Sequence, residues 1–313
     1  MWKFGNLEVS RNEKITGYLE FPTIEEKLPA FLINGAETGP KVLILGGIHG
    51  CEYTSIDAAL KLGINLDPNI VKGQVAVLPI ANPASFYSRS IYVHPRDGKN
   101  LNRMFPGIED GTDAERLAFW LNETAFKQVD YLIDLHGGDM IEALVPFTIY
   151  HVSKDANVLE KSKEMASLYD IKYVVGSSDQ VPGSTYGAAA TQGVPAIIAE
   201  AGQQGILSQE NSVLLQEGTK NILRSLGVLE GEVTRSESQY LSVFDWYRAD
   251  QRGLWYPSVE IGEIVSKGDK LGDITDEFGR VVKTFYSESS GAVLFLVTSL
   301  AINENEPLLA VGE

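Results

Sequence analysis

The stretch "KVLILGGIHGCE", residues 41–52, decides the fold. Its first part, "KVLILGG" (41–47), is an apolar run without polar alternation, which is typical of a strand buried on both faces. The run stops at two glycines, and a histidine and a glutamate then follow, three residues apart. A buried strand that ends beside an imidazole and a carboxylate predicts a site at the carboxyl end of a parallel sheet.

Outward from this stretch, apolar strands alternate with amphipathic helices. Further strands are expected at 74–83, 129–139 and 194–205, and helices at 53–64, 112–128, 155–170 and 210–228. A long polar loop is expected at 84–110. The alternation predicts an α/β fold with a mainly parallel mixed sheet flanked by helices.

The pattern changes at residues 229–240, which are polar and have no period, and short strands with glycine turns follow. We therefore expect an α/β domain over residues 1–235 and a small, barrel-like all-β domain over 236–313. The segment "VSKGDKLGDITDEFGR" (265–280) is similar to biotinyl/lipoyl barrels, but "SESSGAV" (287–293) has no lysine to modify, which argues against a carrier. Trp255 and Tyr256 could reach a pocket rim, although burial of at least one in the small core is favoured.

Composition limits the partners and the compartment. The chain has 313 residues and a formal net charge of −16, which argues against nucleic acid or an anionic membrane surface as a partner. The single cysteine, Cys51, fits a reducing compartment. We see no signal peptide and no apolar run long enough to span a membrane, so we expect a cytoplasmic protein.

Three candidate metal ligands lie at expected strand ends. His49 and Glu52 follow the first strand, and His136 ends "YLIDLH". Two histidines and a carboxylate are a standard catalytic zinc set with an open position for water, so we expect one Zn²⁺ per chain, although other divalent ions suit the same ligands. Taken singly, the His-x-x-Glu pair is more often capping or surface chemistry, and His136 alone could be a strand-end histidine with its hydrogen bonds satisfied.

Two further acids lie at or near strand ends. Glu200 closes the apolar run "PAIIAE", where a carboxylate is costly unless it is paired or functional. Near a metal it could act as the general acid/base that moves a proton from water to a leaving amine. Asp134 lies two residues before His136 on the same strand face, and it either holds that histidine or is a structural acid.

The loop 84–110 suggests what the substrate carries. "NLNR" places Asn102 beside Arg103, and Arg89 and Arg96 flank this stretch. A guanidinium with a neighbouring amide suits a carboxylate, so these residues are the candidate substrate-binding set. The alternative is an ordinary structured loop in which Arg103 forms a salt bridge.

At this point the chain resembles the succinylglutamate desuccinylase/aspartoacylase family of zinc deacylases, which have an M14 carboxypeptidase-like fold. The motifs that carry the resemblance occur in the family's order: "GGIHGCE" (46–52), "DGKNLNRMFPG" (97–107), "DLHGG" (134–138) and "GVPAIIAEAGQQG" (193–205). The resemblance implies zinc ligation by His49, Glu52 and His136, acid/base chemistry by Glu200, and carboxylate binding by Asn102 and Arg103. It also implies a small appended β-domain.

The chain departs from the family at two positions. Tyr92 stands where the family usually has an arginine that polarises the scissile carbonyl, so Arg89 or Arg96 is a candidate substitute, or the substrate preference differs. Cys51 stands where a small or acidic residue is usual, and we expect it to pack rather than bind metal. Tyr186 and Tyr256 are further candidates to face the site. His94 and His151 are interpreted as surface or loop histidines.

The sequence therefore predicts a zinc amidohydrolase acting on a small anionic N-acyl amino acid or a related amide. Two alternatives stay open at this point. One is a metallocarboxypeptidase for short peptides, and the other is a metal-binding module without turnover. The sequence leaves the oligomeric state open, a homo-oligomer included.

Overall fold

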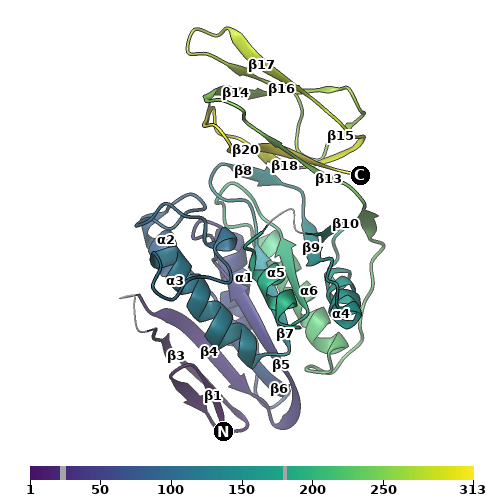
Figure 1. Ribbon diagram of the computed structural model, residues 1–313. Helices are drawn as coiled ribbons and strands as arrows, with labels where there is room; N and C mark the ends of the chain where they lie inside the picture. The colour runs from purple at the N-terminus through teal and green to yellow at the C-terminus, as the bar shows by residue number, and fades with distance from the viewer. Residues whose placement is uncertain (22–25, 179–181) are drawn as a thin grey trace.

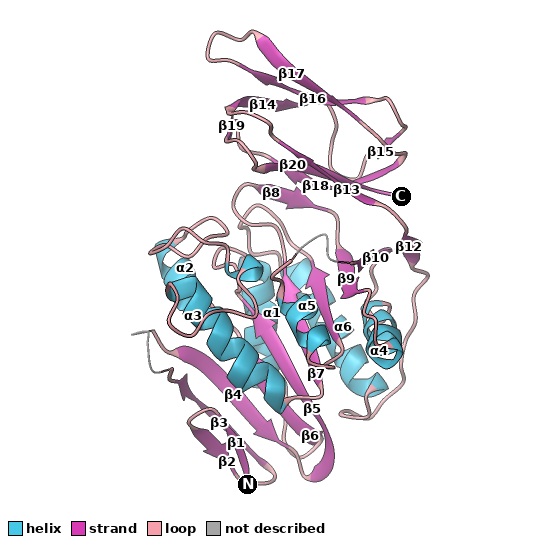
Figure 2. Cartoon of the chain, in the orientation of Figure 1, coloured by secondary structure: helices cyan, strands magenta, loops and turns pink. Residues whose placement is uncertain are grey.

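The computed structural model describes residues 1–21, 26–178 and 182–313, and it combines a large mixed sheet and its helices with a C-terminal region of strands (Figures 1 and 2). The large sheet has nine strands in the order β12-β10-β9-β11-β7-β5-β6-β4-β3. Their bounds are β3 Glu13–Leu19, β4 Leu28–Asn34, β5 Glu37–Gly46, β6 Lys72–Leu78, β7 Tyr131–His136, β9 Phe147–His151, β10 Tyr173–Ser177, β11 Ala196–Glu200 and β12 Gln239–Leu241.

Most neighbouring strands in this sheet are parallel. The pairs β12–β10, β10–β9, β11–β7, β7–β5 and β5–β6 are parallel, whereas β9–β11, β6–β4 and β4–β3 are antiparallel. The expected mainly parallel mixed sheet is therefore confirmed. The sequence analysis did not predict β9 and β10, which extend the sheet beyond β11.

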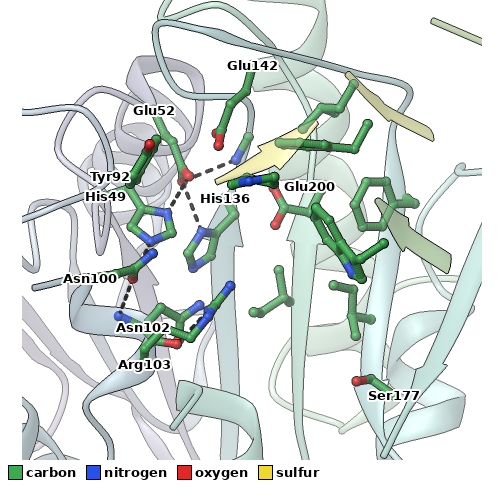
Figure 3. Close-up of a pocket in the computed structure, with 18 of the residues that line it drawn as sticks. His49, Glu52, Tyr92, Asn100, Asn102, Arg103, His136, Glu142, Ser177 and Glu200 are labelled. Carbon is green, nitrogen blue, oxygen red and sulfur yellow. Dashed lines mark hydrogen bonds and ion pairs between the residues drawn. The ribbon is translucent and has the colours of Figure 1, made fainter. Parts of the chain in front are cut away.

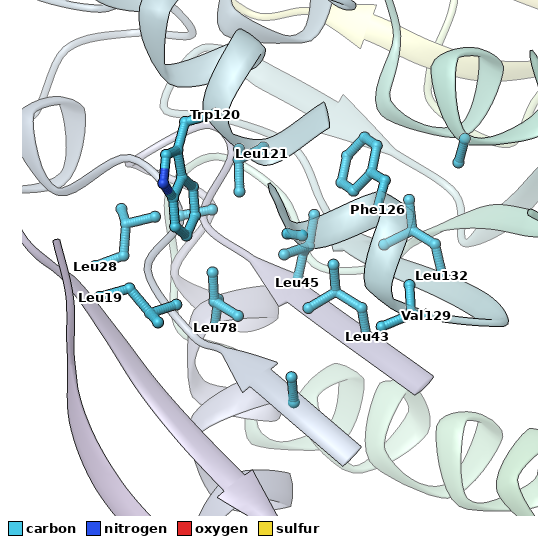
Figure 4. Packing of buried hydrophobic residues seen from close by; sticks show 14 of the residues in the cluster. Leu19, Leu28, Leu43, Leu45, Leu78, Trp120, Leu121, Phe126, Val129 and Leu132 are labelled. Carbon is cyan, nitrogen blue, oxygen red and sulfur yellow. The ribbon is translucent and has the colours of Figure 1, made fainter. Parts of the chain in front are cut away.

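Helices cover both faces of the large sheet. On one face, α1 (Tyr53–Asn65), α4 (Ala156–Ala166) and α6 (Gln209–Ser225) pack over Val42 and Ile44 of β5. On the other face, α3 (Asp113–Trp120) and α5 (Thr185–Thr191) pack over Leu43 and Leu45, as Figure 4 shows for part of this core. The apolar run of β5 is thus buried on both sides, as its sequence indicates.

Two expected segments are more divided than the sequence suggests. The helix expected at 112–128 consists of α3, the π-helical turn η2 (Leu121–Ala125) and the 3-10 turn η3 (Phe126–Gln128). The expected loop 84–110 overlaps α2 (Pro83–Ser88), which is capped by Asn82, and contains the 3-10 turn η1 (Leu101–Arg103). These short turns keep the loop ordered beside the carboxyl end of β5.

The C-terminal region consists of two antiparallel sheets around one core. One sheet has the order β13-β20-β18-β15 and the other β17-β16-β14-β19. Their bounds are β13 Phe244–Arg248, β14 Gly253–Pro257, β15 Ile264–Val265, β16 Lys270–Thr275, β17 Val281–Tyr286, β18 Gly291–Val297, β19 Ala301–Ile302 and β20 Pro307–Gly312. Trp255 is buried in the shared core, whereas Tyr256 is exposed. A separate hairpin, β1 (Trp2–Phe4) and β2 (Leu7–Val9), lies near the N-terminus.

The two parts of the molecule exchange strands. β8 (Glu142–Leu144), from the first part of the chain, pairs with β18 of the C-terminal region, and β12 completes the large sheet. A small core that includes Leu144, Phe147 and Leu294 joins the two parts. No helix in the described residues is long and apolar enough to cross a membrane.

Candidate metal centre and active site

The turn after β5 delivers two of the predicted ligands. β5 ends at Gly46, and Gly47 adopts a left-handed φ of 67°, which turns the chain out of the sheet. Glu52 is the N-cap residue of α1, yet its side chain makes no capping hydrogen bond. Its carboxylate instead faces His49 and His136, so the capping interpretation of the His-x-x-Glu pair is wrong.

His49, Glu52 and His136 converge at one point (Figure 3). His49 Nδ1 lies 2.6 Å from Glu52 Oε1, and His136 Nδ1 lies 3.0 Å from Glu52 Oε2. One ligand atom from each residue lies within 4.8 Å of the others. Two imidazoles and a carboxylate in this arrangement fit a divalent cation such as Zn²⁺, which prefers nitrogen and carboxylate ligands.

The far side of each imidazole is held in place. His136 Nε2 lies 3.0 Å from Asp134 Oδ2, and the Thr185 hydroxyl donates a hydrogen bond to the same oxygen. His49 Nε2 lies 3.0 Å from Asn100 Oδ1. These partners orient both Nδ1 atoms toward Glu52, which is how carboxylates and amides position ligand histidines. The sequence analysis named Asp134 but missed Asn100, although Asn100 begins the stretch "NLNR".

The charges of the three residues support one another. Burial alone would raise the pKa of Glu52, but His136 and His49 lower it to about 2. Burial alone would lower the pKa of His136, but Asp134 and Glu52 raise it well above the usual histidine value. The site therefore keeps an ionised carboxylate at its centre and compensates it with positive charge, a role that a bound cation would take over.

Glu200 lies next to the triad. It ends β11, and the strand register places it directly opposite His136 on β7. Its half-buried carboxylate has no hydrogen bond or ion pair with the described residues. Burial raises the pKa of Glu200 well above the usual glutamate value, with His136 opposing that shift. A half-buried, unpaired carboxylate beside a metal triad is typical of a general acid/base.

The loop after α2 brings Asn102 and Arg103 to the same cavity. The Asn102 side chain is buried, and its Oδ1 accepts a hydrogen bond from Thr185 N at 2.9 Å. Arg103 donates to its neighbour's carbonyl oxygen at 2.7 Å and has no carboxylate within salt-bridge distance among the described residues. Among the described residues the alternative salt bridge of Arg103 is therefore not formed, which suits a guanidinium that binds an anionic ligand.

The other two candidate arginines lie away from the cavity. Arg96 forms ion pairs with Glu26 and Asp113, and Arg89 is the left-handed C-cap residue of α2. Neither residue lines the cavity. The structure thus does not place these two arginines with Arg103: Glu26 and Asp113 engage Arg96, and Arg89 is not among the residues that line the cavity.

The position of the missing family arginine is part of the cavity wall. Tyr92 lines the cavity, its backbone N–H donates to Asp139 at 2.9 Å, and its hydroxyl lies 3.4 Å from Glu306 Oε1. Tyr186 also lines the cavity, whereas Tyr256 does not. The wall at Tyr92 is therefore neutral or acidic where the family usually places a cation.

Two of the remaining expectations can be compared with the structure. Cys51 is buried, and its Sγ lies 3.7 Å from the carbonyl oxygen of Ser90, so it packs beside the triad without joining it. His94 is buried rather than on the surface, because the tight turn that links its backbone to Lys99 folds its ring inward toward Asp97.

The cavity that holds these residues has a volume of about 500 Å³, and the C-terminal region forms part of its wall. The contributions from that region include Phe244, Trp246, Arg248 and Glu306. Sequence reasoning missed all four, and no local signal marks them, since they reach the site only through the packing of β13 and β18 against the large sheet. Glu142, at the start of β8, is a further lining residue that it missed.

Residues 38–226 match the succinylglutamate desuccinylase/aspartoacylase catalytic domain, and the chain belongs to this family. A characterised relative is the N-alpha-acetyl-L-2,4-diaminobutyric acid deacetylase of Halomonas elongata, with 28% identity over 95% of this chain and 91% of that protein.

Two solved structures share the fold over nearly the whole chain. The product-bound ectoine utilization protein EutE (DoeB) from Ruegeria pomeroyi has a TM-score of 0.88 at 24% identity, with 98% of this chain and 97% of that chain covered. A succinylglutamate desuccinylase/aspartoacylase from Rhodobacter sphaeroides has a TM-score of 0.87 at 23% identity, with the same coverage.

Proposed function

We propose that the protein is a zinc-dependent hydrolase that removes the acyl group from a small, carboxylate-bearing N-acyl amino acid. The observation that carries the proposal is the position of Glu200 directly across from His136, in the cavity that also contains the triad and Arg103, with no hydrogen bond or ion pair of its carboxylate in the described parts of the chain. Membership of the deacylase family and the deacetylase activity in the name of the Halomonas relative support it.

The residues of the chain have separate tasks in this reaction. Zinc held by His49, Glu52 and His136 would lower the pKa of water and polarise the amide carbonyl. Glu200 accepts a proton from the attacking water and delivers it to the leaving nitrogen as the C–N bond breaks. Its raised pKa brings proton uptake closer to neutral pH, which suits both steps.

Substrate is oriented by the loop that contains η1. Arg103 pairs with the substrate carboxylate, and Asn102, fixed by Thr185, stabilises the backbone that presents this guanidinium. Fixing one end of the substrate places its amide between the triad and Glu200. The orientational entropy is then lost on binding rather than in the chemical step, which lowers the barrier.

The form of the cavity favours a small substrate over a peptide. The C-terminal region closes one side of the site with Trp246, Arg248 and Glu306. A carboxypeptidase for longer peptides needs an open groove instead. The same wall gives the C-terminal region a role as a cap rather than as a carrier domain. An unpaired Glu200 argues against a metal-binding module without turnover, since binding alone needs no acid/base.

The remaining expectations belong to the same proposal. We infer a cytoplasmic enzyme with one zinc per chain, a division of the chain near residue 235, and a C-terminal fold related to the biotinyl/lipoyl barrels. The exchange of β8 and β12 between the two parts means that neither part is complete without the other.

The test combines metal analysis with one isosteric variant. Purified protein should contain about one zinc per chain, and N-acetyl amino acids should be hydrolysed only by the metal-loaded form. Glu200→Gln should retain zinc and lose at least about a hundredfold in kcat, in line with the usual contribution of acid/base catalysis. The matched control is Glu210→Gln, at an exposed position on α6, which should leave both properties unchanged. Unchanged turnover by the Glu200 variant would remove that residue from the mechanism.

A further inference from the structure

Aliphatic side chains line one end of the cavity. The strand register places Val175 of β10 opposite Ile149 of β9, and Ile149 opposite Ile198 of β11. Directly opposed residues share a sheet face, so these three form a row across the sheet. Ile198 lies two residues before Glu200, so the row lies on the face that also carries the proposed acid/base.

Aromatic rings form the adjoining wall. Phe147 of β9 contacts Phe244 of β13 with ring centroids 5.6 Å apart, and Phe244 contacts Trp246 at 5.4 Å. All three line the cavity. We call the space bounded by Ile149, Val175, Ile198, Phe147, Phe244 and Trp246 the apolar chamber. Its wall comes partly from each of the two parts of the molecule.

The six side chains that define the apolar chamber carry no ionisable group. Two charged residues of the cavity neighbour them in sequence: Arg248 lies two residues beyond Trp246 on β13, and Glu200, which the reaction itself employs, lies two residues beyond Ile198. Moving an ammonium or carboxylate into such surroundings without a partner costs several kcal/mol. Burying a hydrocarbon there is favourable by about 25 cal/mol per Å² of apolar surface. The chamber therefore selects for an apolar group.

The chamber adjoins the carboxylate-binding end of the site. Tyr186, which lines the cavity, lies close enough to both Arg103 and Glu200 to interact with them electrostatically. In Figure 3, hydrocarbon side chains gather between Glu200 and Ser177, whereas Tyr92 and Asn100 lie on the opposite side of the triad. A substituent on the carbon that bears the carboxylate would thus point into the chamber.

We propose that the apolar chamber binds the side chain of the substrate's amino acid, so that the preferred substrates are short N-acyl derivatives of apolar amino acids. The inference rests on the proposed function, since it takes the scissile amide to lie between the triad and Glu200. The acyl group then lies on the side of Tyr92 and Asn100, where the wall is polar. The Halomonas relative is named for an amino acid with a second amine, so the proposal predicts that the two proteins differ in substrate preference.

The test is a set of kcat/KM values for the zinc-loaded, full-length protein. The substrates are the N-acetyl derivatives of L-leucine, L-phenylalanine, glycine, L-aspartate and L-2,4-diaminobutyrate, together with N-hexanoylglycine. We expect N-acetyl-L-leucine or N-acetyl-L-phenylalanine to exceed each of the others by at least about tenfold, because a few buried methylenes supply that discrimination.

Two variants locate the preference. Phe244→Ala should lower the ratio of kcat/KM for N-acetyl-L-phenylalanine to kcat/KM for N-acetylglycine by about tenfold. Val175→Thr keeps the volume, adds a hydroxyl, and should shift selectivity in the same direction without a large cavity. The control is Phe285→Ala, also half-buried in the C-terminal region but packed on Trp255 outside the cavity, which should not alter selectivity.

The outcomes are distinguishable. If no N-acyl amino acid is hydrolysed, the proposed function is wrong and the inference is wrong with it. If N-acetyl-L-aspartate or N-acetyl-diaminobutyrate is preferred, the deacylase proposal stands and the apolar chamber proposal is overturned. Faster hydrolysis of N-hexanoylglycine than of N-acetyl-L-leucine also overturns it, because the chamber would then hold the acyl group.

Discussion

Among single residues, Glu142 is a second acid of the cavity whose surroundings disfavour its charged form. It lines the cavity, is half-buried, and has Asp139 as a nearby acid. Its one hydrogen bond is accepted from Asp139 N at 3.0 Å. Burial, and then the charge of Asp139, raise the pKa of Glu142 to about 7. The folded protein thus favours the protonated form of this carboxyl group.

This shift predicts a pH-dependent loss of stability in the metal-free protein. Below the unfolded-state pKa, near 4.5, Glu142 is protonated in both the folded and the unfolded protein, so its burial does not lower the free energy of unfolding through ionisation. As pH rises to about 7, the unfolded state ionises first, so the stability from the raised pKa is progressively lost. We therefore compare the free energy of unfolding of Glu142→Gln with that of the wild type. The difference in favour of the variant should be larger at pH 8 than at pH 4.5, by roughly 1–3 kcal/mol.

The measurement is chemical unfolding of chelator-treated protein at both pH values. The exposed Glu277→Gln serves as the control, and its difference from the wild type should not change with pH. A pH-independent difference for the Glu142 variant would contradict the prediction.

At the same scale, the sequence predicted the convergence of residues that lie beside strand ends, and missed cavity residues that come from distant parts of the chain. His49, Glu52, His136 and Glu200 each close or follow an apolar run, so the topology of a parallel sheet suffices to bring them together. Asn100 gains its role only because its loop folds back 51 residues along the chain onto His49. Arg96 was interpreted as a substrate-binding candidate because the local sequence does not reveal its ion-pair partners, Glu26 and Asp113.

At the scale of elements, the sequence predicted strands with an unbroken apolar run, such as "VLIL" in β5, and missed shorter ones. β9 ("FTIYH") and β10 ("YVVGS") are each five residues long, and polar residues or glycine interrupt or end their apolar residues. β9 runs antiparallel to β11 but parallel to β10, a choice set by non-local pairing rather than by its own residues. The three-residue strands β8 and β12 are defined by their pairing with β18 and β10, which local sequence does not predict.

The segment that leads into α5 lies against the loop that contains Arg103. Gly183 has a φ of 80°, and a Cβ there would lie 2.2 Å from the carbonyl oxygen of Arg103. Gly193, just after α5, has a φ of 81° and open space around it. Both glycines thus adopt the left-handed backbone conformation, but only Gly183 lies against the loop that contains Arg103.

This contrast predicts different effects of the same substitution. Gly183→Ala and Gly193→Ala should each lose about 1–2 kcal/mol of stability from the left-handed backbone. Only Gly183→Ala should also displace Arg103 and lower kcat/KM, by between about tenfold and a hundredfold, because small misplacements of binding groups are costly. Steady-state kinetics with thermal unfolding of both variants tests this, and an equal activity of the two would show that the loop tolerates the displacement.

At the scale of the whole molecule, the two parts of the chain depend on each other. β8 belongs to the C-terminal sheet, β12 belongs to the large sheet, and the core around Leu144, Phe147 and Leu294 lies between them. Separate domains are usually joined by polar interfaces that permit independent motion. Here the shared strands make each part incomplete alone, and the cavity exists only when both are folded.

We therefore expect the protein to unfold in one cooperative transition. Leu294→Ala, at the fully buried junction, should lower the free energy of unfolding by about 2–5 kcal/mol, as is usual for such truncations. Leu62→Ala, equally buried on the inner side of α1 on the opposite face of the large sheet, should shift the same single transition by a similar amount. Differential scanning calorimetry checks this, since one transition has equal calorimetric and van't Hoff enthalpies. Two transitions, each shifted by only one of the variants, would instead mean that the C-terminal region folds by itself and docks afterwards.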